Sequence, residues 1–257
     1  MARYVDYAQA NGAARITLVA DNDSGNPINT TSARELLDAV LRAKADDARV
    51  IVLGAKGRFF SVGGDLSSIA AAEHPDAMLL ELAELAHRTV TELVRSAAIV
   101  VSAVQGTAAG IGFPLAAAAD IILAADTARF SLAYTKVGLS PDGGGSLLVN
   151  TLGLHRVLRL VLVGDLLTAL EAYEAGLVAR VVPVEGLDTA VDEMVSALLA
   201  GPRLSLATAK RLVRDAAEPS PESAMRREAE AISRLGGSVD GREGVAAFLA
   251  KRRPEFS

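Results

Sequence analysis

The chain of 257 residues contains no cysteine, no tryptophan and only three histidines. Without cysteine it can form no disulfide, no thiolate metal ligand and no cysteine nucleophile, which fits a protein of a reducing compartment. The histidines, His74, His87 and His155, are not spaced like metal ligands. We therefore predict a cytoplasmic protein without a metal centre.

The chain also lacks an excess of positive charge, with 26 lysines and arginines against 31 acidic residues and a net charge of −5. No nucleic-acid partner is therefore expected. The first twelve residues, MARYVDYAQANG, are too polar for a secretory signal peptide. Ser96–Ala119 is uncharged and long enough to span a membrane, but Gln105, Gly110 and Pro114 interrupt it. This pattern predicts a buried strand, a turn and a helix start, and no membrane segment.

Apolar residues make up 51% of the chain and charged residues 22%, so a large core can be buried. Strand-like segments alternate with helix-length segments, which predicts a layered α/β fold. The expected strands are Arg15–Ala20, Arg49–Leu53, Ala97–Val104, Ile121–Ala125, Arg129–Ser131 and Val178–Val182.

Helices are predicted between and after these strands. Thr31 or Ser32 can cap the first, with Glu35 near its first turn. The second, Asp76–Ser96, is amphipathic. The remaining expected helices are Gly145–Leu152, His155–Val163, Thr168–Ala175, Leu187–Leu199, Arg203–Ala217, Pro221–Leu235 and Gly241–Lys251. Because the C-terminal third is charge-rich and helical, we expect it to be a subdomain that packs on a partner subunit.

Three loops rich in small residues follow buried strands, at residues 54–66, 104–113 and 135–146. In a parallel α/β arrangement such loops meet at one edge of the sheet, where ligands bind. The stretch QGTAAGIGFPLAAAAD, from Gln105 to Asp120, leaves the backbone nearly bare where a helix should begin. Free N–H groups and the helix dipole at that point favour an anion or oxyanion site. A tight turn packed against another element is the alternative.

Five segments in the expected order resemble the enoyl-CoA hydratase/isomerase, or crotonase, family. They are FFSVGGDL, QGTAAGIG, FSLAYTKVGLSPDGGGS, EAYEAGLVARVVP and AFLAKRRPEF. The resemblance implies a crotonase (ClpP-like) spiral of repeated ββα units over residues 1–190 and a C-terminal helical trimerisation region over 191–257. It also implies an acyl-CoA substrate, a homotrimer or dimer of trimers, and no cofactor, since coenzyme A enters as part of the substrate.

By the same resemblance, the backbone N–H groups of Gly64 and Ile111 form an oxyanion hole for the thioester oxygen. Proton abstraction beside a thioester builds negative charge on that oxygen, and one fixed donor can be worth about 3 kcal/mol. The substrate-binding residues implied by matching are Ser61, Val62, Gly63, Gly110, Phe113, Pro114, Tyr134 and Leu139. Coenzyme A is expected near Lys56, Arg58 and Lys251, although plain surface charge explains these three equally well.

The residues that hydratases of this family use for proton transfer are missing. Pro114 and Tyr134 stand where those enzymes carry glutamates. Proline is comfortable in a first helical turn but cannot transfer a proton, and tyrosine, with a pKa of about 10, is a poor base near neutrality. Hydration by two glutamates is therefore not expected. Asp65 is expected to fix its loop through backbone hydrogen bonds.

One acid remains in a suitable place, Asp142 in SPDGGG. The segment resembles the branch of enoyl-CoA and ring-epoxide isomerases, where an aspartate here shuttles the proton. We predict an enoyl-CoA isomerase with Asp142 as acid/base, since one carboxylate suffices for a 1,3 shift. The alternatives are an ordinary turn aspartate in a non-catalytic acyl-CoA-binding homologue, an atypical hydratase, and an aryl-CoA dehalogenase. The last would need tryptophan and a histidine base, whereas His87 is expected on a helix surface or groove.

Overall fold

The computed structural model describes residues 4–19, 25–217 and 220–257, and the strands within these ranges form two sheets. The larger sheet has the order β1-β2-β3-β5-β7-β10 and is parallel except for the β1–β2 pair. The smaller has the order β4-β6-β8-β9 and is parallel except for β9. The strands are Val5–Ala10 (β1), Ala13–Leu18 (β2), Val50–Ala55 (β3), Phe59–Ser61 (β4), Ile99–Val104 (β5), Thr107–Ala109 (β6), Ile121–Ala125 (β7), Arg129–Ser131 (β8), Leu166–Thr168 (β9) and Arg180–Val182 (β10).

Helices pack on both faces of the larger sheet. In β3, Ile51 and Leu53 join the core cluster on the side of α1, whereas Val50 and Val52 join the cluster that contains α8. This explains the uninterrupted apolar strand that the sequence predicted. The α-helices are Thr30–Ala45 (α1), Leu66–Ala71 (α2), Pro75–Arg95 (α3), Gly112–Ala117 (α4), Val149–Leu152 (α5), Leu154–Leu162 (α6), Ala169–Glu174 (α7), Leu187–Ala200 (α8), Arg203–Ala217 (α9), Pro221–Gly236 (α10) and Val239–Leu249 (α11). The 3₁₀ helices are Ala133–Val137 (η1), Gly145–Leu148 (η2) and Val184–Gly186 (η3).

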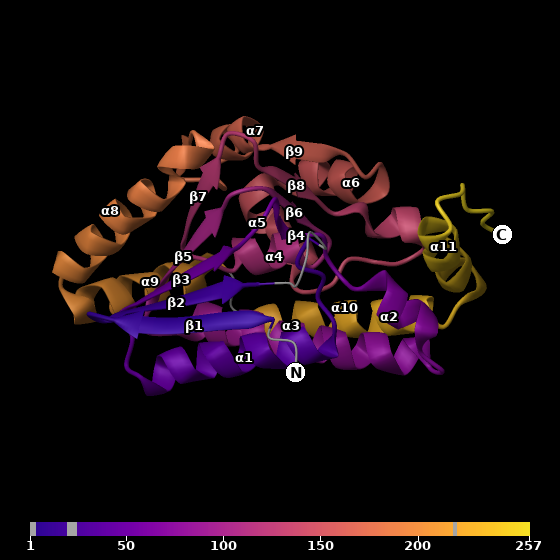
Figure 1. Ribbon diagram of the computed structural model, residues 1–257, viewed down its shortest axis with the longest axis horizontal. Helices are drawn as coiled ribbons and strands as arrows, with labels where there is room; N and C mark the ends of the chain where they lie inside the picture. The colour runs from indigo at the N-terminus through magenta and orange to yellow at the C-terminus, as the bar shows by residue number, and fades with distance from the viewer. Residues whose placement is uncertain (1–3, 20–24, 218–219) are drawn as a thin grey trace.

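The core of the fold repeats a strand–strand unit. β3, β5 and β7 of the larger sheet are each followed within a few residues by β4, β6 and β8 of the smaller sheet. The predicted loops 54–66 and 104–113 therefore contain short strands that the sequence analysis missed. The helices α2 and α3, α4 and η1 follow these units in turn. This is the spiral of repeated ββα units that the resemblance implied, and Figure 1 shows the smaller sheet above α3 and α10, with α1 at the bottom.

The N-terminal strand β1 was also missed, because its residues are mostly half-buried or exposed and carry no apolar pattern. It pairs with β2 through a hairpin whose turn residues, Asn11 and Gly12, both have positive φ. Asn-Gly is the sequence most favoured for that type of turn. The predicted strand Arg15–Ala20 corresponds to β2, and Ala20 lies outside the described residues.

The first helix is capped by a residue other than those predicted. Asn29 is the N-cap of α1, and its side chain accepts a hydrogen bond from the Ser32 N–H in a capping box. The Glu35 carboxylate instead accepts hydrogen bonds from the backbone of Tyr4 and Val5, which ties β1 to the helix. The prediction that Thr31 or Ser32 caps this helix was therefore wrong.

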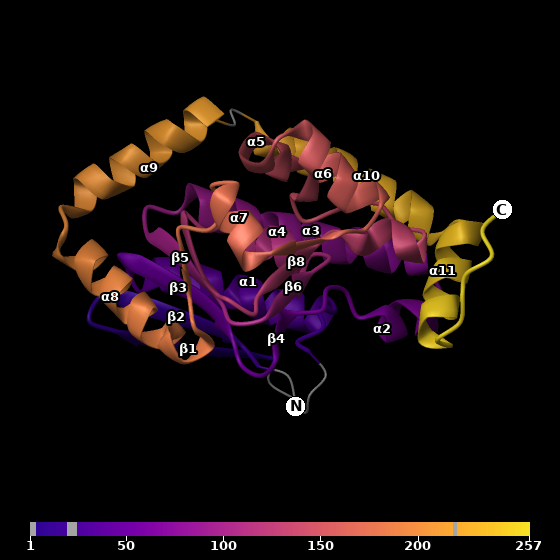
Figure 2. The same cartoon turned by 90° about the horizontal axis from the view of Figure 1, so that it is seen from above.

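The C-terminal helices run from one end of the molecule to the other. Figure 2 shows α8 and α9 along one side, after which the chain returns through α10 beside α3 and ends at α11. The contacts between α10 and α3 are extensive, and α11 contacts α2 and η1. None of the described helices is both long and apolar enough to cross a membrane.

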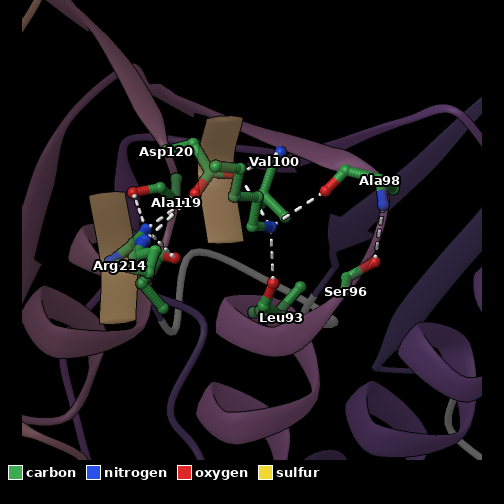
Figure 3. A network of polar contacts seen from close by, with 9 residues as sticks. Leu93, Ser96, Ala98, Val100, Ala119, Asp120 and Arg214 are labelled. Carbon is green, nitrogen blue, oxygen red and sulfur yellow. Dashed lines mark hydrogen bonds and ion pairs between the residues drawn. The ribbon is translucent and has the colours of Figure 1, made fainter. Parts of the chain in front are cut away.

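The helix α9 is held to the body mainly by a polar network, because Lys210 is its one buried residue among those described. Its ammonium group donates to the carbonyls of Leu93 and Ala98 and lies 2.8 Å from a carboxylate oxygen of Asp120. Arg214 contacts the other oxygen of Asp120, as Figure 3 shows. Burial of the Lys210 ammonium lowers its pKa, and the pairing with Asp120 opposes that effect.

Candidate active site

A cavity of about 270 Å³ lies where the three predicted loops converge. Its wall is almost entirely apolar, and helices α3, α10 and α11 add residues to it from outside the three loops. The residues lining it are Val62, Gly63, Gly64, Leu66, Ile69, Leu79, Leu82, Ala109, Gly110, Ile111, Ala133, Tyr134, Val137, Leu139, Asp142, Ile232 and Phe248. This arrangement suits a mainly apolar ligand that meets a few polar groups.

The backbone N–H groups of Gly64 and Ile111 border this cavity from two neighbouring loops. Neither donates a hydrogen bond to any part of the chain that the structure describes. The loops touch at Gly63 and Gly110, both of which have positive φ, and a Cβ on Gly63 would lie 3.0 Å from the carbonyl oxygen of Ala109. Only glycine gives both the backbone conformation and the close approach. Gly64 and Ile111 thus both line the cavity and both have an N–H group without a partner in the described chain.

Asp142 is the only carboxylate among the described residues that line the cavity. Its side chain is 3% exposed, and its Oδ1 accepts a hydrogen bond of 2.7 Å from the hydroxyl of Tyr134. Burial raises the pKa of Asp142 to about 6, although the hydrogen bond from Tyr134 acts in the opposite direction. Burial likewise raises the pKa of Tyr134 well above 10, so its hydroxyl keeps its proton. Asp142 can therefore exchange a proton near neutral pH.

The surroundings of Asp142 include two residues whose positions the sequence analysis did not foresee. His87 was expected on a helix surface or groove, but it is 7% exposed, and its Nε2 accepts a hydrogen bond of 2.9 Å from the N–H of Gly143. Glu228 of α10 was not considered, although its side chain is 6% exposed and contacts the same loop. Helical spacing places Glu228 on the same face of α10 as Met225 and Ile232, a signal that the sequence analysis did not use. Its burial arises from the packing of α10 on α3.

Three of the predicted substrate-binding residues do not line the cavity. Phe113 is fully buried, with its ring centroid 5.0 Å from that of Phe130 in the core. Pro114 is also buried in α4, behind Gly143. The Ser61 hydroxyl donates to the carbonyl of Asn26 and accepts from the N–H of Gly63, so it supports the loop from behind.

The residues predicted to contact coenzyme A lie outside the cavity wall. Lys56 pairs with Asp6 at 3.0 Å, and Arg58 lies over the ring of Phe59. Lys251 is exposed and follows α11, whose Phe248 lines the cavity. Asp65 caps α2 by accepting hydrogen bonds from the backbone of the next turn, as expected from the sequence.

Elsewhere the structure offers less for chemistry. A cavity of about 300 Å³ lies between α3 and α9, but its Lys210 and Arg214 are already paired with Asp120. Within the described ranges, no three acidic or histidine side chains are grouped so that they could hold a metal ion. The convergent cavity with its two free N–H groups and one carboxylate is therefore the candidate active site.

An α/β spiral with an apolar cavity, two free backbone donors and a carboxylate defines a class of proteins suited to polarising a carbonyl. Comparison with known proteins agrees: residues 8–257 match the enoyl-CoA hydratase/isomerase family model. The chain belongs to this family, that of the crotonases, and is an acyl-CoA enzyme of the crotonase type.

Individual relatives cover nearly the whole chain. It is 34% identical over 255 residues to trans-2-decenoyl-(acyl-carrier-protein) isomerase of Streptococcus mutans, covering 98% of this chain and 97% of the relative. It is also 34% identical to 1,2-epoxyphenylacetyl-CoA isomerase of Escherichia coli, covering 90% of each. A solved enoyl-CoA hydratase from Mycobacterium avium subsp. paratuberculosis is 32% identical and covers all of both chains with a TM-score of 0.90. Isomerase and hydratase names thus both occur among the relatives.

Proposed function

We propose that the protein is an enoyl-CoA isomerase that shifts a carbon–carbon double bond through a thioester enolate. The observation that carries this proposal is that Asp142 stands alone as a carboxylate on the described wall of the cavity. A two-glutamate hydratase needs a second proton-transfer group, and Pro114, at the matching position, is buried outside that wall. A 1,3 shift needs only one group, because the proton removed from one carbon is returned to another.

The reaction begins with the thioester carbonyl oxygen bound by the N–H groups of Gly64 and Ile111. Asp142, in its ionised form, takes a proton from Cα or Cγ, and the electrons of that C–H bond pass to the carbonyl oxygen as the enolate forms. The two N–H donors stabilise the charge that develops there. Protonated Asp142 then returns the proton to the other end of the allylic system, so the carboxylate is regenerated and the double bond has moved.

The role of Tyr134 in this scheme is to hold Asp142. Its hydroxyl donates to one carboxylate oxygen of Asp142, which favours the ionised form, while burial favours the protonated form. As a result the pKa of Asp142 is about 6, so both its ionised and its protonated form are accessible near neutral pH. A shuttle that must both take up and release a proton works best in that range.

The test is exchange of acyl-CoA protons with D₂O, together with double-bond migration in 2-enoyl and 3-enoyl thioesters of several chain lengths. Asp142→Asn should abolish both while leaving acyl-CoA affinity largely unchanged. Asp165→Asn, a matched change at a partly exposed aspartate that pairs with Arg159, should leave both intact. If the wild type neither moves the double bond nor exchanges protons in any thioester of the panel, the isomerase assignment fails and a binding protein without catalysis is favoured. Formation of a 3-hydroxyacyl product would indicate hydration instead.

A further inference from the structure

Both carboxylate oxygens of Glu228, in α10, accept hydrogen bonds from the loop that carries Asp142. Oε2 of Glu228 accepts a hydrogen bond of 2.7 Å from the N–H of Gly144, and its Oε1 accepts one of 2.7 Å from the N–H of Ser146. Only a carboxylate can receive two backbone donors in this way, because an amide of the same shape offers one acceptor and one donor group. A glutamate at this position, unlike a glutamine, therefore matches the two N–H donors of the loop.

A second side chain holds the same loop from another helix. His87 of α3 accepts the N–H of Gly143 at Nε2, and that nitrogen lies 3.5 Å from Oε2 of Glu228. Together, the N–H groups of Gly143, Gly144 and Ser146 with these two side chains form what we call the amide clamp. Gly143 and Gly144 have positive φ, and their N–H groups go to two adjacent acceptors, Nε2 of His87 and Oε2 of Glu228.

The amide clamp begins at the residue after Asp142. The titratable groups that act on Asp142 come from three elements: Tyr134 of η1, His87 of α3 and Glu228 of α10. At Gly143 the nearest atoms from α4 and its N-cap are apolar carbons of Pro114 and Ile111.

Glu228 keeps its charge despite being buried. Burial alone would raise its pKa, but the contact with His87 and the hydrogen bonds from the two loop amides lower the pKa below its ordinary value. A fixed negative charge therefore lies behind Asp142 and raises the pKa of that carboxyl. On the outer side of His87 a cleft between α3 and α10 is lined by Glu84, Arg88, Glu222 and Arg226.

We propose that Glu228 and His87 are positioning residues for Asp142: through the amide clamp they fix the loop that carries it and hold a negative charge behind it. The helix α10 is on this account part of the active site and does more than cover it. The proposal rests on the assignment of Asp142 as the proton shuttle. Its physical content, a fixed loop and a charge, can be measured without any substrate.

The first test compares Glu228→Gln with Glu230→Gln, a matched change on the exposed face of α10 where Glu230 pairs with Arg226. Hydrogen exchange followed by mass spectrometry reports the amides of residues 143–146. In Glu228→Gln one amide loses its acceptor and faces a donor, so these amides should exchange about tenfold faster or more. Glu230→Gln should leave their exchange unchanged. Equal protection in all three proteins would overturn the clamp.

The second measurement follows the titration of Asp142 by the infrared band of its protonated carboxyl group, assigned as the band absent from Asp142→Asn. Removing the charge of Glu228 should move this midpoint to lower pH, whereas Glu230→Gln should not move it. A midpoint that stays in place would show that Glu228 acts only as a structural support, which refutes the electrostatic part of the proposal.

His87→Phe provides the independent variant, and it serves if Glu228→Gln does not fold. It removes the acceptor of the Gly143 N–H but leaves the charge of Glu228, so loop exchange should accelerate while the Asp142 midpoint remains well above 3.8. With an active thioester, both variants should lower kcat by about tenfold or more and change KM little, because a misplaced shuttle slows chemistry more than binding. Clamp results that hold in a protein without isomerase activity would refute the proposed function and leave the positioning geometry intact.

Discussion

Replacing Asp142 by asparagine should abolish proton transfer and at the same time make the folded protein more stable at pH 8. The carboxyl is 3% exposed, and its hydroxyl partner, Tyr134, only partly offsets the loss of water around the charge. In the unfolded chain the same carboxylate is fully hydrated. The ionised group therefore favours unfolding, and an uncharged amide of the same shape, which can still accept the Tyr134 hydrogen bond, removes that effect.

The magnitude follows from the pKa of Asp142, which burial raises to about 6 from an ordinary value of 3.8. Each unit of difference corresponds to 1.36 kcal/mol, so Asp142→Asn should raise the free energy of unfolding at pH 8 by up to about 3 kcal/mol. In a protein of this size that is an increase in Tm of roughly 5–10 °C. The sign depends on pH: a raised carboxyl pKa favours the folded state below pH 3.8, and this contribution is lost as the pH rises through 6.

The assay is denaturant unfolding of the wild type and Asp142→Asn at several pH values between 4 and 8. The stability difference should be largest at pH 8 and should become small toward pH 4, where the carboxyl is protonated in the folded state and about half protonated in the unfolded state. Asp165→Asn, at a partly exposed site, should show no such trend. A variant that is less stable than the wild type at pH 8, or a difference that does not change with pH, would refute the account of Asp142 as a buried carboxylate with a raised pKa.

Three further changes test other parts of the structure. Tyr134→Phe removes a hydrogen bond that lowers the pKa of Asp142, so the acid limb of the kcat/KM profile should move to higher pH; an unchanged limb would contradict this role. Gly63→Ala should lower Tm and reduce kcat about tenfold, because a side chain strains the positive φ and displaces the donor next to it; full activity would argue against the oxyanion site. Lys210→Met should lower the free energy of unfolding by about 3 kcal/mol in denaturant titrations, because Asp120 and two carbonyls each lose a donor. A loss below about 1 kcal/mol would show that this network does not hold α9 to the body.

The features that the sequence predicted best were the buried strands and the loops that follow them. Continuous apolar segments such as Arg49–Leu53 predicted strands buried on both faces, and the loops after them do meet at one cavity. The short strands of the second sheet were missed because three-residue segments such as Thr107–Ala109 are too short to show a period. The strand β1 was missed because its sequence, VDYAQA, shows no apolar alternation and its last three residues are exposed. Only the Asn-Gly turn at Asn11 indicated a hairpin.

Side-chain roles that depend on distant contacts could not be predicted. Asn29, Thr31 and Ser32 are all good capping residues, and choosing among them requires the direction in which the chain enters α1. Glu228 follows Asp142 by more than eighty residues in the chain. Helical spacing separates it from the exposed Glu230, because Glu228 shares the face of Met225 and Ile232. The loop that this glutamate contacts is known only once α10 is packed against α3.

The environments of the two buried acids explain why Asp142, and not Glu228, is suited to move a proton. Glu228 receives two backbone donors and a histidine contact, so its pKa is lowered and it stays charged. Asp142 receives one hydroxyl donor and otherwise faces an apolar cavity with a negative charge behind it, so its pKa lies at about 6. Two carboxyl groups whose pKa values are driven apart by their surroundings take different roles. The same lack of compensating donors that destabilises the fold at Asp142 gives that residue a proton affinity suited to reaction near neutral pH.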